Sequence, residues 1–465
     1  MDEIIELERL LKQYFHIINE AVDNAAKQPQ PPQPPQPPPQ PPQPPQPPQP
    51  PPQPPQPPQP PQPPPQPPQP PQPPPQPQPA APNKKIRFIG EGGFGCIFSP
   101  PTILTPIVKQ EYPDPDIKEI NIETYDDKYI AKILNCKVYS YKEELAKHKI
   151  IMKIDPTHKY TPEMIFAGYM NRQVLMDSIK VKRISNIELY DCLDNKLRSD
   201  TNEFYGYIIY NKVGKSLEKL EKDDINKSNI KEVLKNFSAG IRDFINNLYN
   251  KNLIHGDIKT PNMTLEDNKI YFIDFGLTMN YNEIFTKLHF SQNFNYPIIL
   301  HYLYITYQMI ENNKYTKKDY FIYFNMIINN SLSPISLFRL NIHMNILISQ
   351  HQFSIFKNIE DVKTYLKTYI KQLLDKLNDN NKYTKEEVYT LCFSEIAKNI
   401  DIYSLSFALY NLFFNNLYQE DFTLSKLVTD ETLQLISKLF EDALYNNIKN
   451  PIELAERLDN IISTI

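Results

Sequence analysis

Two nearby segments, LIHGDIKTPN at 253–262 and YFIDFG at 271–276, bring together three oxygen-bearing side chains. Asp257 and Asn262 lie in the first segment, and Asp274 lies in the second. Carboxylate and amide oxygens are ligands that Mg²⁺ prefers. A further carboxylate can orient a hydroxyl nucleophile, because in-line phosphoryl transfer depends mainly on positioning and charge neutralisation. The spacing therefore predicts a phosphoryl-transfer site, with Asp274 delivered by a short β-hairpin.

Glycine is scarce in this chain, and four of its ten glycines lie between residues 90 and 95. The pattern G-x-G-x-x-G lets backbone N–H groups close over a phosphate, which side chains with Cβ atoms would obstruct. The Lys-Ser/Thr ending of a P-loop is missing, and strand-like residues flank the glycines, so a β-hairpin flap is predicted. The predicted nucleotide-binding residues of this flap are Ile89, Gly90, Glu91, Gly92, Gly93, Phe94, Gly95, Cys96 and Ile97.

These segments resemble those of the eukaryotic-type protein kinase family, and the resemblance implies that a strand lysine contacts phosphates. The buried-strand candidate YIAKIL contains Lys132, which is the preferred residue for this role. Lys109 competes for this role, but the loop-like sequence PDPD follows it, so Lys132 is the preferred choice. An ion-pair partner for this lysine should lie on the next helix, predicted at about 142–153. Glu143 and Glu144 both qualify there, and Glu144 is selected.

Together these segments resemble the eukaryotic-type protein kinase family, and they occur in that family's order. The resemblance implies that Asp257 is the catalytic base and that Lys259 contacts the γ-phosphate of ATP. It also implies that Asn262 and Asp274 bind Mg²⁺ and that Lys132 clamps the α- and β-phosphates. A Lys two residues after the catalytic Asp is the family's Ser/Thr pattern, so the resemblance implies a serine/threonine kinase acting on protein substrates.

Three features depart from the family pattern. Gly256 stands where regulated kinases have the arginine that binds an activation-loop phosphate, which argues against that form of switching. The Ala-Pro-Glu motif is not recognisable near Pro297, and the arginine that normally pairs with its Glu has no counterpart, because Asn450 and Pro451 occupy that position. A long apolar-rich stretch then precedes Asp401. This stretch is expected to form additional helices.

The helix expected at Asp401, DIYSLSF, resembles the kinase helix whose Asp holds the backbone of the catalytic loop. The combination of HGDIK, GFGC followed by SPP, and the long insert resembles serine/threonine kinases of mimivirus-like giant DNA viruses. The abundance of Asn, Ile, Lys and Tyr fits an AT-rich genome.

Other functions compete with the kinase interpretation. The HGD sequence also resembles antibiotic phosphotransferases, and the loop together with IDFGL resembles the small kinase-like ATPase of the KEOPS complex. Lys259 and the Asp401 helix argue against both. A pseudokinase scaffold is the non-catalytic alternative, and retention of Asp257, Asn262 and Asp274 argues against it.

The order of the elements, strands first and helices later, predicts an α+β fold. The expected architecture is a bilobal protein kinase-like domain at 83–465. Its small β-rich N-lobe covers about 83–210, and its large α-helical C-lobe covers about 215–465. A long helical insert is expected at about 298–400.

The tail before this domain contains two different segments. Residues 1–27 carry apolar residues at alternating spacings of three and four, which predicts an amphipathic helix. This helix is equally expected to pair two chains in a weak homodimer or to pack on the domain at 83–465. Residues 28–82 repeat Pro-Pro-Gln and predict polyproline II. A semi-rigid spacer is favoured over docking of SH3- or WW-type domains.

Charge and cysteine usage limit the partners. Lys plus Arg number 50 and Asp plus Glu 54, so no electrostatic footprint for nucleic acid is expected. No secretory signal and no run of about 18 apolar residues is recognisable, so no membrane contact is expected. The four cysteines form no CxxC pair, which favours reduced thiols, including at Cys96. Reduced thiols are typical of a cytoplasmic protein. For a viral protein, the expected location is the host cytoplasm or the virion.

Overall fold

The computed structural model of the chain describes part of the domain predicted at 83–465. The described residues are 87–91, 95–101, 107–112, 126–135, 140–173, 187–197, 204–221, 223–283, 297–310, 313–330, 355–414 and 424–465. The helix predicted at 1–27, the polyproline segment predicted at 28–82, and Gly92, Gly93 and Phe94 lie outside these residues. Among the described helices, none combines the length and the apolar character that crossing a membrane requires.

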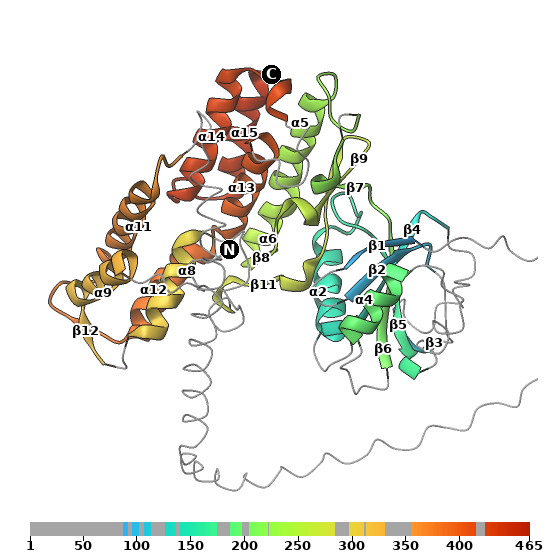
Figure 1. Cartoon of the computed structure of the whole chain (residues 1–465), viewed down its shortest axis with the longest axis horizontal. Helices are drawn as coiled ribbons and strands as arrows, with labels where there is room; N and C mark the ends of the chain where they lie inside the picture. Colours follow the sequence, from blue (N-terminus) through green and yellow to red (C-terminus); the bar gives the residue numbers. More distant parts are fainter. Residues whose placement is uncertain are drawn as a thin grey trace, which may run out of the picture. The chain divides into compact units, whose positions relative to one another are not determined.

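Six antiparallel strands form one sheet in the order β1-β2-β4-β6-β5-β3 (Figure 1). The strands are β1 (Arg87–Glu91), β2 (Gly95–Ser99), β3 (Ile107–Tyr112), β4 (Tyr129–Asn135), β5 (Met164–Asn171) and β6 (Phe204–Asn211). Strands β4 and β6 occupy the centre, and their sequences are almost continuously apolar. Such sequences suit strands that are covered on both faces.

Two helices cover opposite faces of this sheet: α2 (Ser140–Ile154) and α4 (Ile187–Leu197). Because side chains alternate along a strand, Tyr207 and Ile209 of β6 pack with α4, whereas Ile208 and Tyr210 pack with α2. Gly206 allows α2 to approach closely, since a Cβ at this position would lie 2.2 Å from the ring of Tyr141. The sheet therefore has one face directed towards α2 and another directed towards α4.

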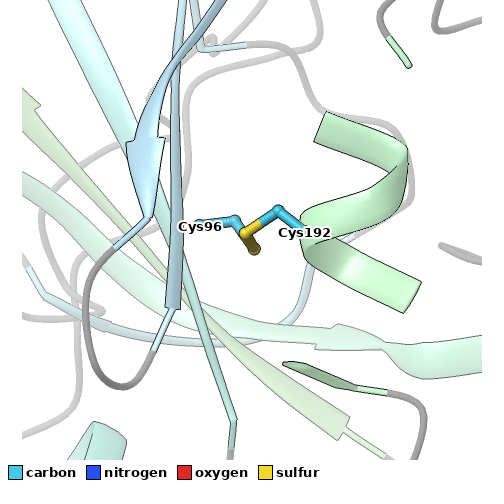
Figure 2. The surroundings of a disulfide bond; sticks show 2 residues. All are labelled: Cys96 and Cys192. Carbon is cyan, nitrogen blue, oxygen red and sulfur yellow. A yellow bond between two sulfur atoms is a disulfide. The ribbon is translucent and has the colours of Figure 1, made fainter. Parts of the chain in front are cut away.

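Cys96 of β2 forms a disulfide with Cys192 of α4 (Figure 2). The expectation of a reduced thiol at Cys96 is therefore wrong for this structure. The two cysteines are 96 residues apart in sequence, and only the packing of α4 on the sheet brings them together. Within the described ranges, Cys392 is the cysteine outside this disulfide, and it is buried.

After the sheet, the described chain is mainly helical. A first group comprises β7 (Lys215–Ser216), η3 (Leu217–Lys219), α5 (Ile230–Gly240), the π-helical turn η4 (Ile241–Ile245), α6 (Asn246–Asn250) and β8 (Leu253–Ile254). Short elements follow: η5 (Thr260–Asn262), β9 (Met263–Glu266), β10 (Lys269–Phe272), η6 (Phe275–Leu277), β11 (Met279–Asn280) and η7 (Tyr281–Glu283). The hairpin β9–β10 lies just before Asp274, where a short β-hairpin is predicted.

The range predicted as an insert contains several described helices. They are α8 (Ile298–Met309), α9 (Lys317–Asn330), α11 (Ile359–Leu374) and α12 (Lys385–Ala397), with a small pairing of β12 (Tyr315–Thr316) and β13 (Lys382–Tyr383). Thr384 begins α12 with a reciprocal capping box to Glu387. These helices pack through one apolar core that is rich in tyrosine.

Helix α13 (Ile400–Phe414) lies between two apolar cores, and 12 of its 15 residues are buried. Tyr403, Phe407 and Tyr410 contact the core of the preceding helices, whereas Leu405 and Leu409 contact the core of the other helical elements. The chain ends with η9 (Leu424–Leu427), α14 (Asp430–Leu444) and α15 (Pro451–Ser463). A helix that is apolar on all sides is expected at such a central position.

The described residues thus combine a sheet with many helices, which is compatible with the predicted α+β class. Asn450 and Pro451, which were placed at the site of a missing arginine, serve as the N-cap and first residue of α15. Their role in the structure is therefore to begin a helix.

Candidate functional site

The loop that follows β8 is held by one buried carboxylate. Asp401, near the start of α13, accepts hydrogen bonds from the backbone N–H groups of His255 (2.7 Å) and Gly256 (3.1 Å). Burial raises the pKa of Asp401, and the neighbouring His255 and the two N–H donors oppose this shift. Two directed bonds to consecutive amides fix the path of the loop.

Gly256 has a structural reason to be glycine. Its φ is +76°, a left-handed conformation that side chains disfavour. A Cβ at this position would also lie 2.6 Å from the carbonyl oxygen of Leu277. A side chain at position 256 would be strained in this loop, so Gly256 has a structural reason in addition to the absence of the arginine expected from the kinase pattern.

Asp257 lies at the centre of the loop's polar contacts. Its Oδ2 receives the Lys259 ammonium at 2.9 Å and the Asn262 amide nitrogen at 2.7 Å. The same nitrogen donates to the Asp257 carbonyl at 2.9 Å. Burial raises the pKa of Asp257, and Lys259 counteracts part of that rise. A carboxylate with a raised pKa and fixed orientation is suited to accept a proton.

Asp274 follows β10 and adopts a left-handed backbone with φ of 62°. This conformation is uncommon for a non-glycine residue and is often found at functional sites. The N–H of Ile273 donates to the Asn262 carbonyl at 3.0 Å, which places Asp274 beside the loop. Lys132 lies 3.4 Å from the Asp274 carboxylate and lowers its pKa.

Lys132 of β4 forms a buried ion pair with Glu144 of α2. Its Nζ lies 2.7 Å and 2.9 Å from the two Glu144 carboxylate oxygens. Burial lowers the pKa of Lys132, but Asp274 and Glu144 together outweigh this effect and raise it. The competing lysine, Lys109, belongs to β3. Strands β6 and β5 separate β3 from β4, the strand of Lys132.

Helix α2 also contacts the loop that contains Asp274. The Lys147 ammonium donates a hydrogen bond to the Gly276 carbonyl. The Phe275 ring lies 6.1 Å from the His148 ring and 5.0 Å from the His255 ring, measured between centroids. These contacts connect α2, the Asp274 loop and the loop of Asp257 through packed side chains.

The glycine-rich hairpin lies next to Lys132 in the sheet. Strands β1 and β2 pair with Glu91 opposite Cys96 and Gly90 opposite Ile97, and Ile97 in turn lies opposite Lys132. Gly95 allows close packing, since a Cβ there would lie 2.2 Å from the Ile133 carbonyl oxygen. Neighbouring residues alternate between faces, so the Cys96 side chain lies on the α4 face, away from Lys132.

Asn262 and Asp274 have the donor atoms that a magnesium ion requires. The amide nitrogen of Asn262 donates to Asp257, so its Oδ1 is the atom left for a metal, and Asp274 supplies a carboxylate. These hard oxygen donors fit Mg²⁺. Among the described residues, no group of three or more His, Cys, Asp or Glu side chains forms a metal cluster, and a site completed by substrate phosphates does not need one.

Comparisons with known proteins support a distant relationship to protein kinases. No protein-family model matches the chain. Over 137 residues it is 23% identical to the B1 kinase of vaccinia virus (strain Western Reserve) and to the B1 kinase of monkeypox virus. This region covers 28% of the chain and 45% of each viral protein, so the chain spans less than half the length of the curated relatives it matches. The particular similarity to mimivirus-like kinases stays a prediction.

The structure also places residues near the site that the sequence did not single out. His148 and Tyr210 contact the region of Glu144, and Cys192 bonds to the strand of the glycine-rich hairpin. His148 follows Glu144 by one helical turn, a spacing that was available as a signal. Tyr210 and Cys192 carried no spacing signal, because their positions depend on how distant elements pack.

Proposed function

We propose that the chain is a serine/threonine protein kinase that transfers the γ-phosphate of Mg-ATP to protein hydroxyl groups. The observation that carries this proposal is the convergence of Lys132, Glu144 and Asp274 from three separate elements, beside a loop with Asp257. Similarity to the viral B1 kinases supports the same chemistry. The proposal includes a bilobal kinase-like fold, with the sheet as the smaller lobe.

Asp257 is the proposed catalytic base. Its carboxylate takes the proton from the substrate hydroxyl while that oxygen bonds to the γ-phosphorus. The bond from the γ-phosphorus to the β–γ bridging oxygen breaks, and ADP leaves with the electron pair. The raised pKa of Asp257 favours proton acceptance, and Asn262 keeps the carboxylate oriented.

Two lysines supply positive charge near the transferred phosphate. Lys259 contacts Asp257 and is the proposed partner of the γ-phosphate, and its position in the sequence is the basis for proposing Ser/Thr substrates. Lys132, oriented by Glu144, is the proposed partner of the α- and β-phosphates. Asn262 and Asp274 would hold Mg²⁺, which supplies charge neutralisation on the phosphates when bound.

The test is transfer of labelled γ-phosphate from Mg-ATP to the protein itself and to generic Ser/Thr substrates. Asp257→Asn and Asp274→Asn should each reduce the rate by about 10²–10⁴-fold, the usual contribution of such groups. Asp379→Asn is the matched control, since Asp379 is an exposed carboxylate in the turn after α11 and pairs with Lys317 of α9. This control should retain wild-type transfer.

Other outcomes assign other functions. ATP hydrolysis without labelling of protein would favour a kinase-like ATPase, and labelling of a small hydroxyl compound would favour a small-molecule phosphotransferase. A folded protein that binds nucleotide but transfers nothing would indicate a pseudokinase scaffold. Transfer to tyrosine alone would contradict the proposed Ser/Thr specificity.

A further inference from the structure

Tyr210 lies at the end of β6 on the face of the sheet that packs with α2. It is paired with Ile130 of β4, two residues before Lys132, so both side chains project from the same face. The Tyr210 side chain is buried, as is the Lys132–Glu144 pair. A tyrosine is unusual at a fully apolar position unless its hydroxyl finds a partner.

Two contacts join Tyr210 to α2, one through its hydroxyl and one through its ring. The hydroxyl donates to Glu144 Oε1 at 3.4 Å, the same oxygen that receives Lys132 at 2.7 Å. The ring makes an edge-to-face contact with His148, with centroids 5.1 Å apart. Glu144 and His148 are four residues apart, so Tyr210 spans one turn of the helix.

We propose that Tyr210 is a positioning residue that fixes the Glu144 carboxylate, and through it the Lys132 ammonium, in the arrangement that binds nucleotide. This inference rests on the proposed kinase function. Lys132 lies between two carboxylates, Glu144 at 2.7 Å and Asp274 at 3.4 Å. A third contact on Glu144 restricts how its carboxylate can rotate. Without that contact, the ammonium has more freedom to move towards Asp274.

The protonation states of the neighbouring groups support this role. Burial, together with the nearby Glu144 and Asp274 carboxylates, raises the pKa of Tyr210, so its hydroxyl keeps the proton that it donates. Burial lowers the pKa of His148 to about 3, so the ring against Tyr210 is neutral. The contact is therefore a neutral aromatic pair beside a single hydrogen bond to a carboxylate.

The test compares two tyrosines of the same strand. Tyr210→Phe removes the hydroxyl and keeps the ring, whereas Tyr207→Phe removes a hydroxyl on the opposite face, in the core towards α4. Tyr210→Phe should raise the KM for ATP about three- to tenfold, the size expected for one ordinary hydrogen bond, because the contact to Glu144 is long at 3.4 Å. The KM for the protein substrate should not change. Tyr207→Phe should leave both KM values at the wild-type level.

Amide hydrogen exchange of α2 provides a readout that does not need kinase activity. Tyr210→Phe should increase exchange in the turn that contains Glu144, and Tyr210→Leu, which also removes the ring, should increase it further. Equal exchange in Tyr210→Phe and Tyr207→Phe would overturn the inference. So would a lower Tm of Tyr210→Phe with an unchanged KM for ATP, because that result describes a purely structural role.

Failure of the proposed function gives a different result. A wild-type protein that transfers no phosphate would reject the kinase proposal, while the exchange of α2 would still decide whether Tyr210 fixes Glu144. An active wild type whose KM for ATP is insensitive to Tyr210→Phe would reject the inference and leave the kinase proposal standing.

Discussion

The two sides of the candidate site are held in different ways. On one side, the loop containing Asp257 is fixed through its backbone, because Asp401 accepts hydrogen bonds from two consecutive amides. On the other side, Lys132 is fixed through side chains that come from a strand, a helix and a loop. Backbone anchoring makes the loop insensitive to the identity of most side chains. Side-chain anchoring makes the position of Lys132 depend on where α2 lies.

The largest effect is expected from removing the backbone anchor. Asp401→Ala leaves two buried N–H groups without an acceptor, and each such group costs about 1–3 kcal/mol. We therefore expect unfolding in urea to show a loss of about 2–6 kcal/mol, with loss of phosphate transfer. Asp401→Asn, which keeps one acceptor oxygen, should lose less. Equal stability of the Ala variant and wild type would show that the loop holds its shape without Asp401.

The disulfide on the sheet side should give the second largest effect. Cys192→Ala, or reduction of the wild type, frees a loop of nearly 100 residues, and such disulfides typically contribute about 2–4 kcal/mol. The measurement is the Tm with and without dithiothreitol. Reductant should lower the Tm of wild type and leave that of Cys192→Ala unchanged. An unchanged Tm when dithiothreitol is added to oxidised wild-type protein would contradict the pairing of Cys96 with Cys192.

Removing the Glu144 partner of Lys132 should lower the free energy of unfolding less than the two changes above. It should weaken nucleotide binding more. Removing one partner of a buried ion pair usually costs about 3–5 kcal/mol, but Asp274 still accompanies Lys132 in Glu144→Gln, so we expect about 1–3 kcal/mol. The KM for ATP should rise about tenfold or more. Glu143→Gln is the matched control, because Glu143 is the exposed neighbour on the same helix. Equal KM values for the two variants would remove Glu144 from the proposed site.

The sequence predicts well those elements that depend on local patterns. Strand β4, helix α2 and the hairpin β9–β10 lie where their patterns place them, because periodicity and turn signals are local. The preference for Lys132 over Lys109 also relied on local context, since YIAKIL is typical of a buried strand whereas the loop-like sequence PDPD follows Lys109. The contact of Lys132 with Glu144 agrees with the selected pair, while the binding roles of these residues stay predictions.

Packing between distant elements could not be predicted from local patterns. Strands β3 and β5 and helix α4 were not identified, and the pairing of Cys96 with Cys192 depends on α4 lying on β2. Gly256 was assigned by analogy to a lost arginine, although its φ and the nearby Leu277 carbonyl give a physical reason for glycine. Such reasons appear only when the backbone path is known.

Removing the partly exposed contact of Asp243 should give the smallest effect. Its size shows whether burial determines how much a polar contact contributes to stability. Asp243 of η4 receives the Tyr160 hydroxyl at 2.6 Å and Lys159 at 2.9 Å, in the segment that follows α2, but its side chain is 47% exposed. Solvent screening limits such contacts, so Asp243→Asn should cost at most about 1 kcal/mol at pH 7. The KM for ATP should stay at the wild-type level.

The pH dependence of that small effect follows from the direction of the pKa shift. The Tyr160 hydrogen bond, with Lys159, lowers the pKa of Asp243 below its ordinary value. A carboxylate with a lowered folded-state pKa stabilises the protein above its unfolded pKa of about 3.9, and this contribution disappears as the pH falls through the folded value. Urea unfolding of wild type and Asp243→Asn should therefore differ most near pH 7 and converge in acid. A difference that does not shrink as the pH falls below about 3.9 would assign the effect to packing of the side chain. Charge would then not explain the contrast between buried and exposed contacts.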